Sequence, residues 1–232
     1  MASPHVSGIA AMLKSAHPDW SPSAIKSAIT TTANPLDNTQ KRMTVATTNE
    51  PTTPYGTGSG LIDPNRALDP GLIYDATPQD YVNLLCSMNF TEDEFKTIAR
   101  SAINHHNCSN PSDDLNYPSF TALYEFDRDG NNYPLLVKKF TRTVTNVGSG
   151  AARYRALVKV PKNTSISVSP QVLTFGKKYE KKRYTLTIRY RGEGRESYVF
   201  NYGSITWAEQ NGKHTVRSPI SVSPIILPWG EF

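Results

Sequence analysis

Several features that mark common functional classes are missing from this 232-residue sequence. The apolar stretch at its start, residues 6–13, is too short to cross a bilayer, and no basic residues precede it as they do in a secretory signal peptide. The glycine-rich residues 56–60 lack the Gly-Lys-Ser/Thr that a phosphate-binding loop requires. No internal repeat is evident. We therefore expect no membrane span, no signal peptide and no nucleotide site.

Cysteine is scarce, with only Cys86 and Cys108, 22 positions apart. No second Cys/His pair stands at zinc-site spacing, so residues 105–108, HHNC, predict a solvated loop rather than a metal site. Three sequons for N-glycosylation occur, and two of them flank the cysteine pair. This combination favours a secreted protein in which the cysteines are bridged; the alternative is two unrelated buried thiols. The sequon residues are Asn89, Asn107 and Asn163.

Acidic residues are sparse in the second half of the chain. Residues 1–114 carry 7 Lys+Arg against 12 Asp+Glu, a net of −5, whereas residues 115–232 carry 18 against 8, a net of +10. This asymmetry predicts a boundary near residue 115. Lysines at strand edges commonly prevent edge-to-edge pairing, but the net charge also fits a face that binds a polyanion. Nucleic acid is disfavoured, because no recognised motif is present. The basic clusters are Lys138-Lys139, Lys177-Lys178 and Lys181-Lys182-Arg183.

An almost wholly apolar helix is predicted at the start of the chain. Ser3 is a candidate N-cap, Pro4 suits the first turn, and Pro18 should end the helix near residue 17. The residues between place apolar or small side chains on every face, as in a helix surrounded by other protein. Burial of its four large apolar side chains would contribute about 1.5–3 kcal/mol each, so we expect packing partners outside this chain. These side chains are Val6, Ile9, Met12 and Leu13.

Three further helices are marked by caps. Ser21 and Pro22 predict a helix to about Thr32, followed by an irregular loop over residues 34–54. Thr77 and Thr91 each begin a capping box and predict helices over residues 81–88 and 95–103. Residues 61–64, LIDP, are not expected to open a capped helix.

From residue 116 onward the apolar periodicity changes to two. About seven short alternating segments, separated by turn residues, predict a β-sandwich of the immunoglobulin or fibronectin type III kind. The predicted strands are 139–146, 152–160, 165–168, 171–175, 182–190, 198–207 and 213–222.

Seven segments carry a family resemblance. Residues 1–8, MASPHVSG, resemble the end of the pattern Gly-Thr-Ser-Met-Ala-x-Pro-His-Val of subtilisin-like serine proteases. Residues 17–28, HPDWSPSAIKSA, are similar to the plant branch of that family. Five more segments follow in the family's order and extend the resemblance over nearly the whole chain. They are GSGLIDP (58–64), ALDPGLIYD (67–75), DLNYPSF (114–120), RTVTNVG (142–148) and VRSPI (216–220).

The resemblance implies that the reactive serine directly precedes the residue matching Met1. In subtilisin-type enzymes the triad runs Asp, His, Ser along the chain, so the other two members lie further upstream, as does the oxyanion-hole Asn. We therefore expect no catalytic residue in this chain. His5 should be a structural residue of the first helix.

The predicted fold class is α+β. Residues 1–76 would be the C-terminal helical remnant of a subtilisin-type α/β catalytic domain, and residues 77–114 a helical connector with the probable disulfide. Residues 115–232 would form a fibronectin type III-like antiparallel β-sandwich.

By resemblance, the intact enzyme is a serine endopeptidase that cleaves polypeptides through an acyl-enzyme. Its partner would be the missing N-terminal part of the catalytic domain, and it would be secreted to the apoplast or cell wall. This chain alone is expected to be inactive and to support the protease, without cofactor, metal, nucleic acid or membrane. The alternative is a stand-alone basic sandwich that binds cell-wall polyanions or protein partners.

Overall fold

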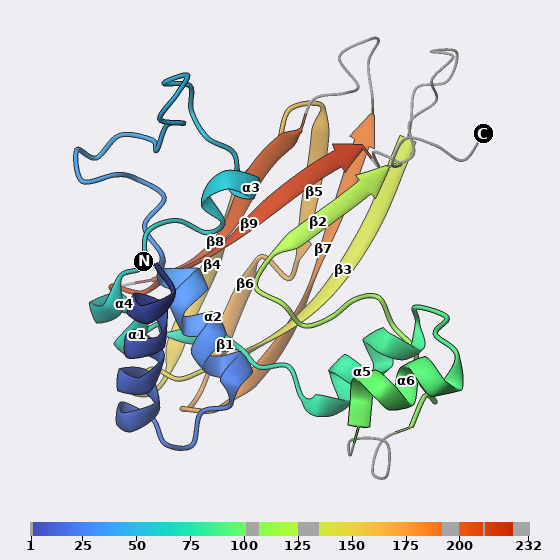
Figure 1. Cartoon of the computed structure of the whole chain (residues 1–232). Coiled ribbons are helices and arrows are strands. Elements are labelled where there is room, and N and C mark those ends of the chain that lie inside the picture. The colour runs from blue at the N-terminus through green and yellow to red at the C-terminus, as the bar shows by residue number, and fades with distance from the viewer. Residues whose placement is uncertain (1, 101–106, 125–134, 192–199, 211, 225–232) are drawn as a thin grey trace.

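The computed structural model describes residues 2–100, 107–124, 135–191, 200–210 and 212–224 (Figure 1). Its helices are α1 (Ala2–Ala16), α2 (Pro22–Thr32), α3 (Pro54–Thr57), α4 (Pro64–Leu68), α5 (Pro78–Cys86) and α6 (Glu92–Ala99). Its strands are β1 (Leu72–Tyr74), β2 (Phe120–Tyr124), β3 (Leu135–Asn146), β4 (Ala152–Lys159), β5 (Thr164–Ser169), β6 (Val172–Phe175), β7 (Lys181–Arg191), β8 (Asn201–Glu209) and β9 (Thr215–Pro224).

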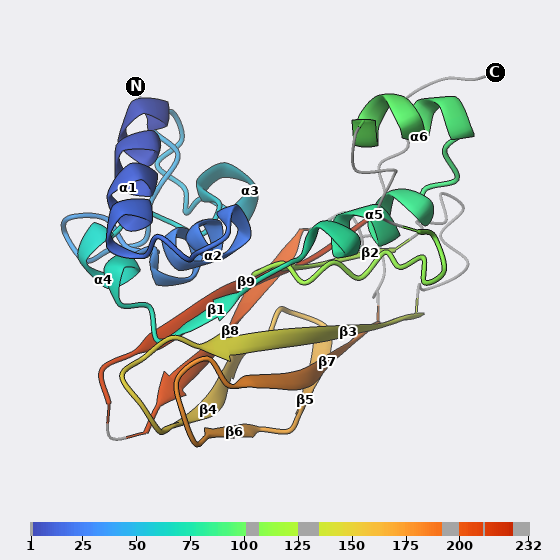
Figure 2. The same cartoon turned by 90° about the horizontal axis from the view of Figure 1, so that it is seen from below.

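Two sheets pack face to face, with strand orders β1-β3-β7-β5 and β2-β9-β8-β4-β6 (Figure 2). Alternate side chains of each strand point between the sheets, where Trp207, Tyr154 and Phe175 are among the fully buried residues. The predicted α+β class, with helices followed by a fibronectin type III-like sandwich, is confirmed. One pairing differs from the antiparallel prediction, because β2 runs parallel to β9.

The predicted strands correspond to β3–β9, with bounds shifted by a few residues. Two strands were not predicted. β1 is only three residues long and wholly buried, so it shows no alternation. β2 alternates, with Phe120, Ala122 and Tyr124 inward, as a half-buried strand does, so the signal was present in the sequence. Because β1 pairs with β3, the segment predicted as residues 1–76 contributes a strand to a sheet of the sandwich.

The cap predictions for α2, α5 and α6 are confirmed, since Ser21, Thr77 and Thr91 each accept a hydrogen bond from the backbone N–H three residues on. The prediction for α1 is off by two residues, because the helix already includes Ala2 and Ser3; Pro4 still lies in its first turn.

The prediction that residues 61–64 open no capped helix is wrong. Asp63 accepts a hydrogen bond from the N–H of Arg66 at 3.1 Å and caps α4, with Pro64 at its first position. The helix has five residues, so no apolar periodicity marks it in the sequence. Helix α3 is shorter still and lies within a segment for which no helix was predicted.

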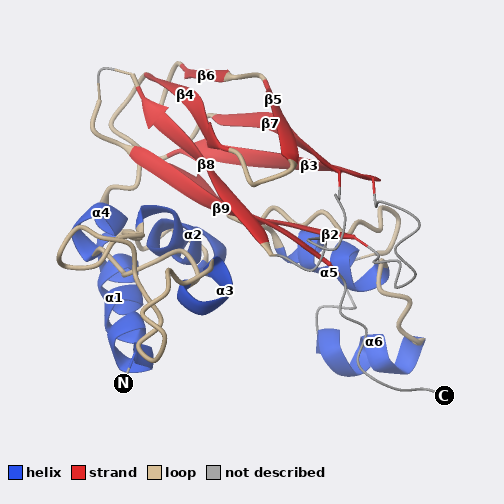
Figure 3. Cartoon of the chain, turned by 90° about the horizontal axis from the view of Figure 1, so that it is seen from above, coloured by secondary structure: helices blue, strands red, loops and turns tan. Residues whose placement is uncertain are grey.

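Helices α1, α2 and α4 cluster on one side of the sandwich, and α5 and α6 lie apart from them (Figure 3). The cluster has its own small core, in which Leu13, Trp20 and Ala28 pack with Ile73 of β1. Within the described residues no helix has the length and apolar character to cross a membrane.

Candidate functional site

Helix α1 is covered by this chain on one face only. Leu13 is fully buried against α2 and α4, whereas Val6 and Met12 are 39% and 43% exposed. The helix was predicted to be surrounded by protein, but the described residues cover only part of its surface. An apolar helix face is thus left open beside α2.

A groove of 670 Å³ runs along this open side. It is lined mainly by apolar side chains of α1, α2, the turn between them and the segment that ends at Ile62. Large exposed apolar patches of this kind mark interaction surfaces in soluble proteins. The main apolar lining residues are Val6, Ala10, Trp20, Ile25, Ile29 and Ile62.

The described histidines lie in three different surroundings. His5 is exposed on α1. His17 stacks on Trp20 with ring centroids 3.9 Å apart, and its Nε2 lies 2.9 Å from the carbonyl oxygen of Leu68. His105 and His106, predicted to belong to a solvated loop, fall outside the described residues.

His214 is held between two carboxylates. Its Nδ1 lies 2.6 Å from Glu209 Oε2, and its Nε2 lies 2.9 Å from Asp69 Oδ2, without the alignment of a hydrogen bond. Burial acts to raise the pKa of Asp69, but the contacts with His214 and Lys213 outweigh it, so the pKa lies below its ordinary value. Both ring nitrogens face carboxylates, so this histidine is not placed to accept a proton from a serine.

Across the described part of the chain, no group of three or more His, Cys, Asp or Glu side chains is placed to hold a metal ion.

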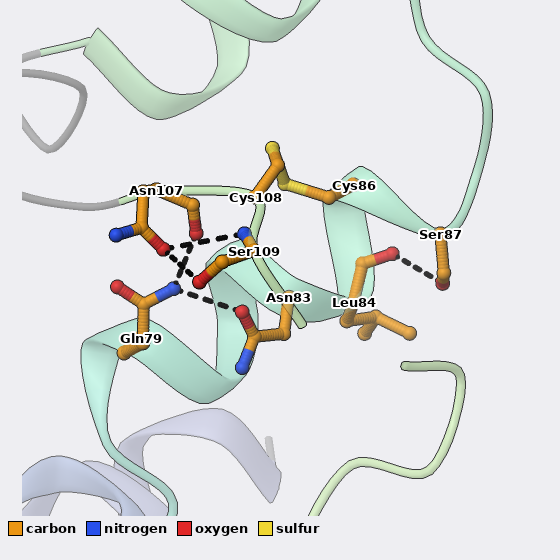
Figure 4. Close-up of a disulfide and its surroundings, with 8 residues drawn as sticks. All are labelled: Gln79, Asn83, Leu84, Cys86, Ser87, Asn107, Cys108 and Ser109. Atoms are coloured by element: carbon orange, nitrogen blue, oxygen red, sulfur yellow. Dashed lines mark hydrogen bonds between the residues drawn. A yellow bond between two sulfur atoms is a disulfide. The ribbon is translucent and has the colours of Figure 1, made fainter. Parts of the chain in front are cut away.

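The disulfide joins α5 to the segment before the sandwich (Figure 4). The Cα atoms of Cys86 and Cys108 are 5.7 Å apart. Gln79 Nε2 donates to Asn83 Oδ1 at 2.8 Å and to the carbonyl oxygen of Asn107 at 2.7 Å, so hydrogen bonds along α5 support the bridge. The bridged form, rather than two unrelated thiols, is the one the structure contains.

The three sequon asparagines lie at the surface. Asn89 and Asn107 are exposed, and Asn163 is partly exposed. At Asn107 the side-chain Oδ1 accepts hydrogen bonds from Ser109 Oγ at 2.6 Å and from the Ser109 N–H at 3.2 Å. This Asx turn brings the amide and the hydroxyl of one sequon together, and Figure 4 shows both beside the disulfide.

Two of the segments that carry the family resemblance contact each other. Asp114 pairs with the buried guanidinium of Arg142 and accepts the Thr141 N–H at 2.6 Å. Asn116 accepts the Thr143 N–H at 2.9 Å and donates to the Thr143 carbonyl at 3.0 Å. Residues 114–117 therefore satisfy the edge of β3 where none of the described strands pairs with it.

The outer face of the four-stranded sheet is strongly basic. The register pairs outward residues of β7 with outward residues of β3 and β5, and the core-facing residues of β7 are buried. Strands β3, β5 and β7 contain no acidic residue, and no ion pair is recorded for the exposed cations of this face in the described residues. We call this set the basic face: Lys139, Lys181, Arg183, Arg189 and Arg191.

Other predicted basic residues lie differently. Lys138 pairs with Asp113 and Lys182 with Glu180, at 2.5 Å and 2.6 Å. Lys177 and Lys178 lie in the turn before β7. Residues 138–139 and 181–183 lie on stretches that pair with a neighbouring strand on one side only, as edge protection requires.

Comparison with known families gives two matches. A model of the subtilase family matches residues 1–60, and a model of the fibronectin type-III domain matches residues 114–222.

Among known proteins, the subtilisin-like protease SBT3 of Solanum lycopersicum is 66% identical over 229 residues, which cover 99% of this chain and 29% of that protein. The subtilisin-like protease SBT1.6 of Arabidopsis thaliana is 42% identical over 96% of this chain and 29% of its own length. A solved FixG-related protein from Vibrio parahaemolyticus covers 39% of this chain and is itself covered to 81%, with 12% identity and a TM-score of 0.33. The chain thus spans less than a third of the length of these plant relatives.

Proposed function

The chain belongs to the plant subtilisin-like proteases, of which it carries the C-terminal portion, and we propose that it completes the catalytic domain of a secreted serine endopeptidase. In this proposal residues 1–76 are the end of the catalytic domain, residues 77–114 a connector, and residues 115–232 a supporting sandwich. The substrates are polypeptides, and the missing N-terminal part of the catalytic domain is the partner of this chain.

The observation that carries the proposal is the open apolar side of α1. The groove of 670 Å³ and the exposed Val6 and Met12 fit a helix that packs against further protein, and a subtilase model matches this segment. Both side chains are already more than half buried, so covering the rest of their surface contributes about 1 kcal/mol each, which favours docking of the remaining domain over exposure to water.

The position of α1 also suits the chemistry. By family resemblance, the reactive serine directly precedes Met1 and so lies at the N-terminal end of α1. Free N–H groups and the positive end of the helix dipole favour the negative charge that develops on the attacked carbonyl oxygen. The chain would supply this electrostatic element, whereas the nucleophile, base and orienting Asp come from upstream.

We expect the chain alone to have no peptidase activity. A fluorophosphonate probe should leave the purified chain unlabelled. Joining the upstream part of the tomato relative, through its reactive serine, to Met1 should give a protein that is labelled and cleaves peptides. A version with that serine changed to alanine is the control.

A second variant tests the groove itself. Val6→Asp, at a residue that lines the groove, should leave the melting temperature of the isolated chain nearly unchanged, because Val6 is 39% exposed there, but should lower labelling of the joined protein by about tenfold or more. Labelling of the isolated chain, or an inert joined protein beside an active tomato enzyme, would contradict the proposal.

Secretion to the apoplast or cell wall is part of the same proposal. The bridge between Cys86 and Cys108 needs an oxidising compartment to persist, and the three sequons are accessible at the surface. We propose that Asn89, Asn107 and Asn163 carry N-linked glycans.

A second function is favoured by the basic face. Five exposed cations on one side of a sheet, with no acidic residue on its three long strands, fit a surface that binds an acidic cell-wall polysaccharide. This function would hold for the sandwich with or without the protease.

A further inference from the structure

A smaller cavity, of 220 Å³, lies on the outer side of the five-stranded sheet, opposite the basic face. Strands β4, β8 and β9 form its floor, and the segment from residue 35 to residue 59, which includes α3, forms the facing wall. Figure 1 shows α3 beside β8 and β9. Tyr55 of α3 packs on Phe200 with ring centroids 5.2 Å apart, and this contact joins the wall to the floor.

Three cations from separate elements line this cavity: Lys159 of β4, Arg217 of β9 and Arg42 of the facing segment. The register pairs Lys159 with Ser204 of β8, and Arg217 with Thr206 two residues further along β8. Neighbouring strands are ~4.8 Å apart and the two pairs are offset by two residues, ~7 Å, so the backbones of Lys159 and Arg217 flank β8 at roughly 12 Å. A ligand lying over Ser204 can therefore contact cations on both sides.

No acidic side chain is among the residues that line this cavity in the described structure. Several of the other lining residues carry hydroxyl groups, which are hydrogen-bond donors beside the three positive charges. The hydroxyl-bearing lining residues are Thr52, Thr57, Ser59, Tyr202 and Ser204.

Arg217 is the most informative of these residues. Its Nη1 donates to the carbonyl oxygen of Ser59 at 3.0 Å, and the described residues provide no carboxylate partner for it. Burial lowers the pKa of Arg217, with no nearby acid to offset it. By contrast, the buried Arg142 pairs with Asp114. A partly desolvated guanidinium without a counter-charge is costly unless an anion joins it.

We propose that this cavity binds a small dissolved oxyanion, a carboxylate or phosphate of the size of a single sugar acid, between Arg217, Lys159 and Arg42. The volume equals that of about seven water molecules at ~30 Å³ each, and it is below the ~300 Å³ of pockets for larger organic ligands. Planar guanidinium groups match carboxylate and phosphate oxygens geometrically. The site goes beyond the proposed protease role and does not depend on it.

Calorimetric titration of the full chain with inorganic phosphate and with galacturonate, at ionic strength held constant with sodium chloride, tests the site. At least one anion should bind saturably with one-to-one stoichiometry. Lys159→Met and Arg42→Met should each weaken that binding by about tenfold, or ~1.4 kcal/mol. Neither side chain has a hydrogen bond or ion pair recorded within the described structure, so both variants should fold. Arg217→Met should weaken binding at least as much.

Arg155→Met is the matched control, because Arg155 lies on the same strand and the same side as Lys159 but does not line the cavity. It should bind the anion as the unchanged chain does. Saturable binding that is equally weakened by Arg155→Met, or that is unaffected by Lys159→Met and Arg42→Met, would overturn the proposal. So would the absence of saturable binding for both anions.

Discussion

At the scale of single residues, His214 links the two halves of the chain through its ring. Asp69 lies just after α4, in the segment that precedes the sandwich, whereas Glu209 ends β8 and His214 precedes β9. Both carboxylates lie within 3 Å of the ring nitrogens, and Lys213 lies 3.4 Å from Asp69. The ring therefore bridges a carboxylate from each of these two segments.

This cluster predicts a pH-dependent stability. The pKa of Asp69 is lowered in the folded chain, so its contribution is present above its unfolded value of ~3.9 and is lost as pH falls through the folded pKa. Asp69→Asn should cost about 1 kcal/mol or less at pH 6, as partly exposed ion pairs do, and almost nothing near pH 2. Urea unfolding at the two pH values measures the difference.

Glu50→Gln, which removes an exposed acid from the loop over residues 34–54, serves as the comparison and should change stability little at either pH. An Asp69→Asn cost that is the same at pH 2 and pH 6 would show that the charge of Asp69 does not contribute.

At the scale of elements, the connector of α5 and α6 is made of two short helices with a capping box each. Neither buries more than one residue fully, since Val82 alone is buried in α5 and none is in α6. Helices of eight or nine residues are marginal alone, so the caps and the Cys86–Cys108 bridge must supply much of their order.

Changing both Cys86 and Cys108 to serine should destabilise this connector. A bridge that closes a loop of 22 positions contributes about 3 kcal/mol in the chain-entropy model. Limited proteolysis should then cut within residues 87–107 much faster than in the unchanged chain. A reducing agent should bring the unchanged chain to the same rate and leave the double variant unaffected; if it accelerates both equally, the bridge is not the cause.

Local signals explain which elements were predictable. The caps of α2, α5 and α6 depend on residues three positions apart, so the sequence displays them directly. Strands β3–β9 alternate and are separated by turn residues, whereas β1 is wholly buried and α4 has a single turn, so neither shows a period. The anion cavity was not predictable, because Arg42, Lys159 and Arg217 meet only through the strand register and the folded loop.

At the scale of the whole molecule, charge is divided between the two parts of the chain. Residues 115–232 carry a net of +10, and the basic face on the outer side of the four-stranded sheet carries five of these cations. A flat cationic sheet surface attracts an extended polyanion more strongly than a scattered set of the same charges does.

The basic face predicts binding to polygalacturonate. Changing Arg183 and Arg189 together to Gln should weaken binding by about tenfold and reduce its salt dependence, since two exposed cations leave the contact surface. Arg153→Gln with Arg155→Gln removes the same charge from the other sheet and should have little effect. Co-sedimentation at two salt concentrations measures both; an equal loss in the two pairs would indicate net charge rather than a face.

The pairing of Leu72–Tyr74 with β3 has a practical consequence for moving the sandwich into another protein. If the chain were cut after residue 76, β1 would be lost and the end of β3 would have no hydrogen-bonded strand on that side. Val144, which is fully buried in the intact fold, would then be exposed. A transferable domain must therefore begin before Leu72. This boundary lies earlier in the chain than the change in charge near residue 115 indicates.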